Sequence, residues 1–309
     1  MIVTGSRGFI GSVFALRAIE RGHRVLALDD ESRGENDIAE RIGSSYLKYD
    51  CARGICGALE QVAPGAQVDV VAHFAAATGS LDRPLAELLE LNVDMTRHVY
   101  QDALTLNAKT FLWPTTSLAL GVPDSPYVES KERALAMLKE VDQAARISVP
   151  LRFFNVAGAY KGLSEFRKQE VHLIPTLARL HASGEALTIN GDDYDTVDGT
   201  PSRDFVHVLD VVEYLLDMAE GAAVVPCHDD GAVWLGTGYA TTVKQVVALY
   251  EQFVGDDVDV KIGPRRAFDC GSLTVAPDQA LQFARCRGGL APAWMSIRDE
   301  VKAMRGWRA

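Results

Sequence analysis

Short apolar runs alternate with longer segments of helical periodicity through the first half of the chain. The apolar runs predict a first strand at the N-terminus and further strands near residues 24–28, 45–49, 68–74, 110–115 and 148–153. Apolar residues at helical spacing predict helices near residues 10–21, 84–106 and 126–145. Strands that alternate with helices form parallel sheets, because a parallel pair needs a long crossover connection. The pattern therefore predicts an α/β fold built on a doubly wound parallel sheet.

A glycine-rich segment follows the first apolar run directly. Gly5 permits a tight turn, Gly8 lets the backbone approach a pyrophosphate, and Gly11 lets the next helix pack on the strand. The N–H groups and the positive dipole end of that helix then face the anion. The segment predicts a Rossmann-type dinucleotide site formed by Gly5, Gly8, Phe9, Ile10 and Gly11.

Asp29 ends the second predicted strand, at about the twenty-residue spacing at which an acidic side chain binds an adenosine ribose. A carboxylate there repels a 2′-phosphate, so the expected cofactor is NAD. Arg33 keeps NADP as the alternative. A glycine triplet alone also occurs in ordinary turns, and it is the strand, helix and acid in register that favour a cofactor site.

Tyr127 and Lys131 have the Tyr-x-x-x-Lys spacing that places both side chains on one helix face. An ammonium group beside a phenol favours the phenolate, which makes the tyrosine a usable base. The same spacing is common on solvated helices. Here the helix begins at Ser125 and Pro126 and follows a strand that ends in hydroxyl side chains, a context that favours catalysis.

Composition and charge narrow the classes of protein. A chain of 309 residues with 48% apolar content buries a large core and usually divides into two domains. The net charge of −11 argues against nucleic acid and anionic membranes as partners. The five cysteines are scattered without a CxxC pair, so we expect reduced thiols and no metal site. The sequence shows neither a signal peptide nor a long apolar span, which predicts a cytoplasmic protein.

Residues 194–210 read Tyr-Asp-Thr-Val-Asp-Gly-Thr-Pro-Ser-Arg-Asp-Phe-Val-His-Val-Leu-Asp. This order of loop, arginine and apolar strand resembles the signature of UDP-galactose (UDP-glucose) 4-epimerases, which belong to the extended short-chain dehydrogenase/reductases. The resemblance spans nearly the whole chain. It implies NAD-dependent epimerisation at carbon 4 of a UDP-hexose through a transient 4-keto intermediate, with Tyr127 as base and then as acid. It also implies a homodimer that is formed by helices 84–106 and 126–145.

The resemblance assigns further residues to the two ligands. For NAD it implies contacts from Asp50, Cys51, Phe74, Ala75, Ala76, Asn92 and Lys131. For the UDP-sugar it implies contacts from Thr116, Ser117, Tyr127, Asn155, His172, Leu173, Thr188, Ile189, Arg203, Arg266 and Asp269. The hydroxyl of Thr116 is expected to bond the reacting sugar oxygen, with Ser117 as its close competitor. Arg203 is expected to clamp phosphate through its planar fork, with a surface ion pair as the alternative.

Two histidines of the same motifs are expected to be structural. His73 ends the fourth predicted strand, where we expect backbone hydrogen bonds to hold it. His207 is expected to cap a helix over residues 208–220.

Departures from the family pattern leave other activities open. Related 4,6-dehydratases and decarboxylases carry an acidic residue after the catalytic threonine, whereas residues 117–120 carry none. The alternatives are another NDP-sugar oxidoreductase of the same fold, or a catalytically weak NAD-binding regulatory protein. The loops at 78–83 and 122–126 look shortened, and Leu273 stands where some members carry a bulky tyrosine. The identity of the hexose therefore stays open.

The resemblance also implies a division into two domains. We expect an NAD-binding domain of residues 1–155 plus a chain return at about 206–237. A smaller nucleotide-sugar-binding domain is expected to comprise residues 156–205 plus 238–309.

Overall fold

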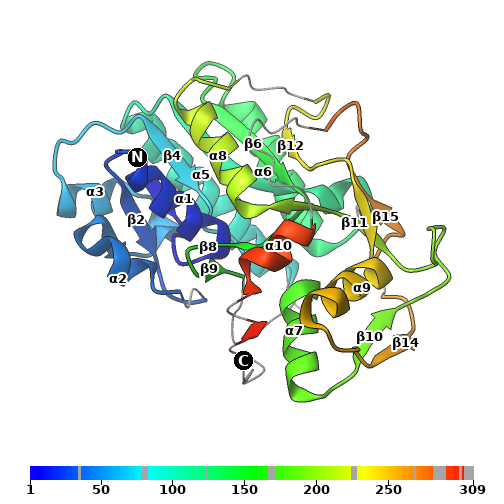
Figure 1. The fold of residues 1–309 in the computed structure, drawn as a ribbon. Helices are drawn as coiled ribbons and strands as arrows, with labels where there is room; N and C mark the ends of the chain where they lie inside the picture. The colour runs from blue at the N-terminus through cyan, green and yellow to red at the C-terminus, as the bar shows by residue number, and fades with distance from the viewer. Residues whose placement is uncertain are drawn as a thin grey trace. The chain divides into compact units, whose positions relative to one another are not determined.

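The computed structural model describes residues 1–33, 36–77, 83–122, 124–165, 172–223, 228–266, 269–280, 290–298 and 301–302. The chain forms two compact units (Figure 1). The first unit comprises Met1–Ala119, Pro123–Arg152 and Val212–Val233. The second unit comprises Leu120–Val122, Phe153–Val211 and Trp234–Ala309. The main crossings therefore follow residues 152, 211 and 233, within six residues of the expected 155, 206 and 237.

A seven-stranded sheet, in the order β12-β6-β5-β4-β1-β2-β3, is the framework of the described part of the first unit. Its strands are β1 (Ile2–Thr4), β2 (Leu26–Asp29), β3 (Tyr46–Lys48), β4 (Val70–His73), β5 (Thr110–Thr116), β6 (Ser148–Phe153) and β12 (Val233–Leu235). The pairs that β1 makes with β2 and β4 are parallel, as are the pairs β2 with β3 and β4 with β5. The doubly wound parallel sheet is thus confirmed. The strand order reverses between β1 and β4, and ligands of such sheets bind at the carboxyl ends of the strands there.

Helices pack along this sheet (Figure 1). They are α1 (Phe9–Glu20), α2 (Ile38–Ile42), α3 (Cys56–Val62), α4 (Leu85–Leu89), α5 (Met95–Thr105), α6 (Pro126–Val141) and α8 (Val208–Ala219). Short 3-10 turns lie at Gly43–Ser45, Cys51–Arg53 and Ser117–Leu120. One continuous core joins strand residues such as Ile2, Val71 and Phe111 to Tyr100 of α5 and Leu135 of α6. Burial of this apolar face is the main stabilising contribution.

Two predicted helices differ from those observed. The helix expected over residues 84–106 is divided by a π turn at Glu90–Asp94, which turns Asn92 into the interior. The helix expected over 126–145 ends at Val141, because Asp142 accepts hydrogen bonds from the N–H groups of Ile147 and Ser148 and so begins the path into β6. Both differences depend on side-chain contacts that helical periodicity does not encode.

The second unit is built around β11 (Ser202–His207). This strand pairs antiparallel with β13 (Ala240–Thr242) and parallel with β15 (Ser272–Leu273) and β7 (Asn155–Ala157). Separate pairs join β10 (Leu187–Asn190) to β14 (Val260–Gly263) and β8 (Ala159–Tyr160) to β9 (Leu163–Ser164). The helices are α7 (Leu173–Ser183), α9 (Val243–Val254) and α10 (Leu290–Ser296), and their core includes Leu177, Tyr250 and Trp294.

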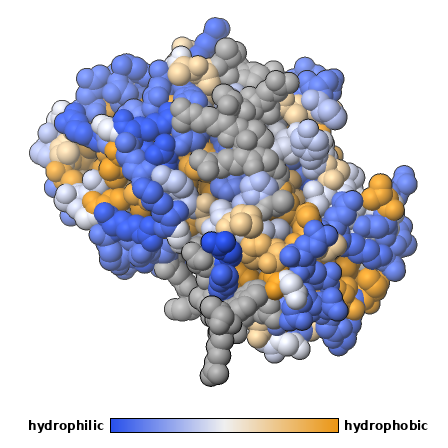
Figure 2. Space-filling view, viewed as in Figure 1, coloured by the Kyte–Doolittle hydropathy of each residue, from blue (hydrophilic) through white to orange (hydrophobic). Residues whose placement is uncertain are grey.

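The face shown in Figure 2 is mostly hydrophilic, with smaller hydrophobic patches between the polar residues. Within the described ranges, no helix has the length and hydropathy to cross a membrane.

Candidate active site

The glycine-rich segment makes the tight turn that the sequence predicts. Gly5 has a φ of +67°, and a Cβ there would lie 2.5 Å from the backbone nitrogen of Ala75. A Cβ on Gly11 would lie 2.3 Å from the carbonyl oxygen of Gly5, so the start of α1 also requires a bare backbone. Gly8 precedes α1, and its N–H bonds Gly5 O at 3.0 Å. Phe9 is buried and Ile10 is partly exposed at the first turn.

Asp29 lies at the end of β2 and is 8% exposed. Its two carboxylate oxygens accept backbone N–H groups from Arg7 and Glu31, each at 2.8 Å. Burial raises the pKa of Asp29, and these two hydrogen bonds oppose that shift. Each oxygen retains a further lone pair, so the carboxylate has the acceptors that ribose hydroxyls need. Arg7 pairs with Glu31, as does Lys48, so the Glu31 carboxylate offsets part of the positive charge of these two cations.

Three buried polar atoms near these segments have no hydrogen-bond partner among the described residues. They are Ser6 Oγ and Arg7 Nε in the glycine-rich segment, and Thr115 Oγ1 at the end of β5. Buried polar groups are nearly always paired, so such atoms fit a site that is completed by a polar ligand. Together with the bare turn and Asp29, they show that the residues present fit a dinucleotide.

The remaining cofactor candidates lie at the carboxyl ends of neighbouring strands. Asp50 is exposed two residues beyond β3 and caps the turn Cys51–Arg53 by accepting Ala52 N at 2.8 Å. Cys51 is 4% exposed, and burial raises the pKa of its thiol to about 12, which keeps it neutral. Phe74, Ala75 and Ala76 directly follow β4 and are partly exposed, as a surface that supports a cofactor must be.

Asn92 occupies a different environment. It is 1% exposed, and its amide bonds the backbone of Ala77 and the hydroxyl of Ser130. These bonds occupy both the oxygen and the nitrogen of the amide. The proposed role of Asn92 in NAD binding is therefore indirect, through the backbone of Ala77 and the helix of Ser130. His73 is bonded by the hydroxyls of Thr4 and Thr96, where backbone groups were expected.

The three catalytic candidates come together where β5 ends and α6 begins. Ser125 caps α6 by accepting Val128 N at 3.1 Å, and Pro126 occupies the first helical position, as predicted. The side chain of Thr116, which is 7% exposed, lies close enough to Tyr127 to lower the pKa of the phenol. Lys131 Nζ lies 6.0 Å from the centroid of the Tyr127 ring. The site therefore joins a phenol, a hydroxyl and an amine.

Burial controls the ionisation of this site. It raises the pKa of Tyr127 to about 12, although the nearby Thr116 side chain lowers it. It lowers the pKa of Lys131 to about 7, and Lys131 Nζ donates to the carbonyl of Pro114 at 3.3 Å. Tyr127 is therefore protonated at neutral pH and holds a proton that it is able to exchange with a bound oxygen. Ser117 is buried beside Thr116, whose hydroxyl accepts Leu118 N at 3.2 Å.

Arg152 supports the site and was not singled out from the sequence. It is 2% exposed on β6, and its Nη1 donates to the carbonyl oxygen of Thr116 at 2.5 Å. The same guanidinium pairs with Glu132 and Asp230, which compensate its burial. The available signal was a lone arginine inside the apolar run Pro150–Phe154.

The substrate candidates of the second unit centre on Arg203 of β11. This side chain pairs with Asp269, and its Nη1 also donates to the carbonyls of Ser202 at 2.7 Å and Cys270 at 3.1 Å. Three acceptors thus hold both terminal nitrogens of the guanidinium. Leu273 lies in register with Arg203 on β15 and is 4% exposed.

Arg266 lies near the strand β10. Asn190, with its amide oxygen turned to accept, bonds Arg266 Nε at 3.1 Å. Thr188 is exposed and Ile189 is buried on this strand. Arg265, which the sequence analysis did not select, lies 4.0 Å above the Tyr194 ring in a cation–π contact.

Other candidates in the second unit occupy element boundaries. Asn155 begins β7 opposite Phe205 of β11. His172 is the N-terminal flanking residue of α7, is exposed and pairs with Glu165, while Leu173 is the first helical residue. These positions leave their roles in substrate binding as proposals.

Asp204 is a second residue that sequence reasoning missed. It is fully buried next to Arg203 and accepts N–H groups of Thr237, Gly238 and Val275. It thereby joins the loop before β13 and the segment after β15 to β11. Its available signal was an acidic residue at the start of an apolar strand, inside the motif of residues 194–210.

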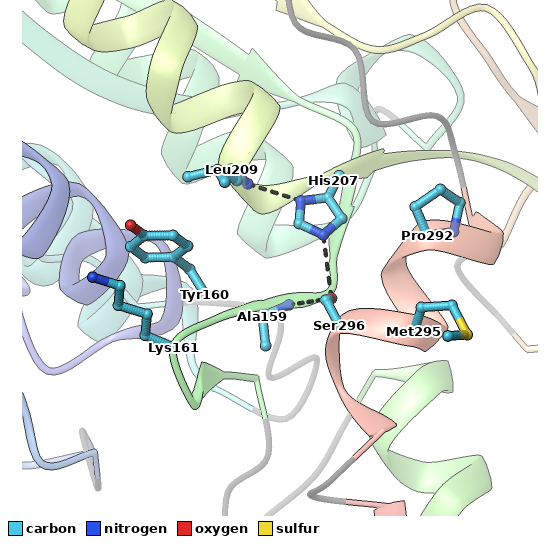
Figure 3. Close-up of a pocket in the computed structure, with 8 residues that line it drawn as sticks. All are labelled: Ala159, Tyr160, Lys161, His207, Leu209, Pro292, Met295 and Ser296. Atoms are coloured by element: carbon cyan, nitrogen blue, oxygen red, sulfur yellow. Dashed lines mark hydrogen bonds between the residues drawn. The ribbon is translucent and has the colours of Figure 1, made fainter.

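A separate pocket of about 760 Å³ lies in the second unit. Figure 3 shows His207 of β11 and Ser296 of α10 hydrogen-bonded to each other in its lining, at 3.2 Å. His207 Nδ1 accepts Leu209 N at 3.1 Å, in agreement with its expected capping role. None of the predicted ligand-binding residues lines this pocket, which is formed by Ala159, Tyr160, Lys161, His207, Leu209, Pro292, Met295 and Ser296.

Comparisons with known proteins agree with this geometry. The model of the NAD dependent epimerase/dehydratase family matches residues 1–228. UDP-glucose 4-epimerase from Corynebacterium glutamicum is 30% identical over 303 residues, which cover 91% of this chain and 88% of that protein. The structure of UDP-glucose 4-epimerase from Brucella ovis in complex with NAD has a TM-score of 0.82, 28% identity and 97% coverage of both chains. The Bifidobacterium longum enzyme in complex with NAD+ and UDP has a TM-score of 0.81, 25% identity and 99% coverage of both chains.

Proposed function

The chain belongs to the NAD dependent epimerase/dehydratase family, and we propose that it epimerises a UDP-hexose at carbon 4 through a transient 4-keto intermediate. The observation that carries this proposal is the cluster of Thr116, Tyr127 and Lys131, in a unit whose turn after β1 fits a dinucleotide. The UDP-glucose 4-epimerases that match nearly the whole chain support the same reaction. NAD is the cofactor, with Asp29 as its proposed ribose ligand.

The chain's own residues handle the proton of the reaction. When NAD is bound, it supplies a reversible acceptor for the hydride of carbon 4. Burial keeps Tyr127 protonated at neutral pH, so it must first lose that proton to act as the base. As the tyrosinate it takes the proton of the 4-hydroxyl and later returns it, while the hydroxyl of Thr116 holds the same sugar oxygen. Lys131, when protonated, stabilises the tyrosinate by its positive charge. No acidic side chain follows Thr116 in residues 117–120, which favours epimerisation over elimination.

The second unit supplies the proposed hold on UDP. Arg203 and Arg266 provide planar forks suited to a diphosphate, and Asp269 provides acceptors for a ribose hydroxyl. In the structure Arg203 is paired with Asp269, and Arg266 contacts Asn190. We propose Asn155, His172, Leu173, Thr188 and Ile189 as the remaining contacts. This division lets the binding energy come from contacts with UDP, while the hexose stays free to rotate within the site.

We also propose a cytoplasmic homodimer formed through α5 and α6. Leu104 on α5 and Val141 at the end of α6 are exposed apolar side chains, 37% and 47% exposed, which supports a partner surface there. A two-fold dimer would bring the same helices of both copies together. Light scattering at micromolar concentration measures the mass, and a monomer would contradict the proposal.

Turnover of a panel of UDP-sugars tests the activity. The purified protein is incubated with UDP-glucose, UDP-galactose and their N-acetyl analogues, and the products are separated. We expect interconversion of 4-epimers without net consumption of NAD. A product that has lost water would favour another NDP-sugar oxidoreductase. NAD binding with no product from any sugar would favour the regulatory alternative.

A further inference from the structure

His73 lies at the centre of a buried hydrogen-bonded chain in the first unit. It ends β4 and is 1% exposed. Its Nδ1 lies 2.8 Å from Thr4 Oγ1 of β1, and its Nε2 lies 3.1 Å from Thr96 Oγ1 of α5. The imidazole therefore joins three elements of the fold, and neither ring nitrogen is left without a partner.

The protons of the two hydroxyls determine the state of the ring. Thr96 Oγ1 donates its one proton to the carbonyl of Asn92 at 2.9 Å, so it accepts from Nε2–H of His73. Nδ1 must then accept the proton of Thr4 Oγ1, which itself accepts Ala75 N at 3.2 Å. The ring is neutral with its proton on Nε2. Burial and the charge of Lys131 lower the pKa of His73 to about 3, which agrees with this assignment.

The chain continues from Asn92 to the catalytic helix. The Asn92 amide oxygen accepts Ala77 N at 2.9 Å, and its nitrogen donates to Ser130 Oγ at 2.9 Å. Ser130 Oγ in turn donates to the carbonyl oxygen of Tyr127 at 2.7 Å. Hydrogen bonds thus link β1 and the backbone after β4 to the first turn of α6.

We propose that His73 is a positioning residue for the epimerisation, acting through this chain to fix Tyr127 relative to the backbone at residues 75–77 that supports NAD. The inference rests on the proposed function, in which that backbone packs on the cofactor and Tyr127 exchanges the proton. In each hydrogen bond of this network only one of the two groups is able to donate. The hydrogen-bonded chain therefore has one arrangement and resists displacement of either end. Loss of one link leaves a buried donor or acceptor unpaired.

Paired valine substitutions on α5 separate positioning from general stability. Thr96→Val removes the hydroxyl that accepts the Nε2–H of His73 and donates to the carbonyl of Asn92. Thr105→Val removes an exposed hydroxyl that likewise donates to the carbonyl four residues earlier, Gln101 O, at 3.0 Å. For Thr96→Val we expect kcat to fall about tenfold or more, because misplacement of reacting groups slows the chemical step, with KM within about twofold. Thr105→Val should retain both constants. Equal kcat for the two variants at a temperature where both are folded would overturn the proposal.

A double-mutant cycle on NAD affinity tests continuity without depending on sugar turnover. Thr4→Val and Ser130→Ala remove links at opposite ends of the chain, and NAD+ is titrated calorimetrically into nucleotide-free wild type, both single variants and the double variant. We expect the loss of affinity in the double variant to be at least about threefold smaller than the product of the single losses, because one break already frees the chain. If the two substitutions lowered NAD affinity independently, the proposed hydrogen-bonded chain would be overturned. If the wild type turns over no UDP-sugar, the proposed function fails, but this cycle still tests whether the hydrogen-bonded chain couples its two ends.

Discussion

At the residue scale, burial sets the protonation of the amine and the phenol that carry the proposed chemistry. Tyr127 and Lys131 are shifted in opposite directions, because burial disfavours the charged form of each. Arg152 donates to the carbonyl of Thr116, so a buried guanidinium holds the backbone that carries this hydroxyl. Such support matters because small displacements of reacting groups cost large factors in rate.

Lys131→Met should change how stability depends on pH. Burial lowers the pKa of Lys131 to about 7, whereas the unfolded chain keeps a value near 10.4. Between these values the unfolded state binds more protons, so wild-type stability from this group rises with pH and is lowest below about pH 7. We expect Lys131→Met to be more stable than wild type at about pH 6, with the advantage shrinking towards about pH 10. Urea unfolding across that range measures it, and a constant advantage would contradict the lowered pKa.

Tyr127→Phe and Arg203→Ala should produce separable defects. Tyr127→Phe removes proton transfer and should lower kcat by about 10²–10⁴ while UDP affinity stays nearly unchanged. Arg203→Ala removes the proposed phosphate clamp and should mainly weaken UDP binding. Steady-state kinetics and calorimetric titration of UDP compare the two. Wild-type turnover by Tyr127→Phe would show that another group is the base.

At the element scale, the start of α6 decides where Tyr127 lies. The Ser125 hydroxyl satisfies a free N–H group of the first turn, and Pro126 presets the backbone there. The π turn at Glu90–Asp94 performs a similar task on the neighbouring segment, because it places Asn92 against Ser130 of α6. Short features at helix boundaries thus position the site more directly than the helices themselves.

Ser125→Ala should reduce both stability and turnover. The cap is worth about 1 kcal/mol, and its loss frees the turn that carries Tyr127. Thr242→Ala is the matched control, because Thr242 caps α9 in the second unit through a capping box with Gln245. Both variants should lose free energy of unfolding, Thr242→Ala the more because its hydroxyl also donates to Asp198, but only Ser125→Ala should lower kcat. Equal kcat values would assign Ser125 to folding alone.

At the scale of the whole molecule, the chain divides its proposed tasks between two units, each with its own apolar core. The first carries the cofactor turn and the catalytic cluster, and the second carries Arg203, Arg266 and Asp269. The shortened loop at 78–83 lies outside the described residues except for Arg83, as does Pro123 of the loop at 122–126. Leu273 lies beside Arg203 and is a smaller side chain than tyrosine.

Substrate breadth should therefore be wide. Excluding a single substituent by shape is worth only about 1–3 kcal/mol and requires a wall to be present. With shortened loops and Leu273, we expect UDP-N-acetylglucosamine to be accepted alongside UDP-glucose. The ratio of their kcat/KM values measures this directly. A preference of more than about a thousandfold for either sugar would refute the expected breadth.

The sequence by itself determined the features whose physical signal is local. Glycines followed by a helix, an acid at the end of the second strand, and a Tyr-x-x-x-Lys pair behind a Ser-Pro start each act within a few turns of chain. Strand 148–153 and the start of α6 were predicted at their observed positions for the same reason. The family resemblance extended this reading to NAD and a UDP-sugar.

Tertiary structure alone decided which distant side chains support those features. Arg152 reaches Thr116 across 36 residues, His73 reaches Thr4 across 69, and Asp204 reaches Thr237 across 33. Each contact joins separate elements of its unit, and no hydrophobic period or motif spacing specifies such a pair. They form because buried polar groups require partners, and only the packed fold determines which partners are within reach.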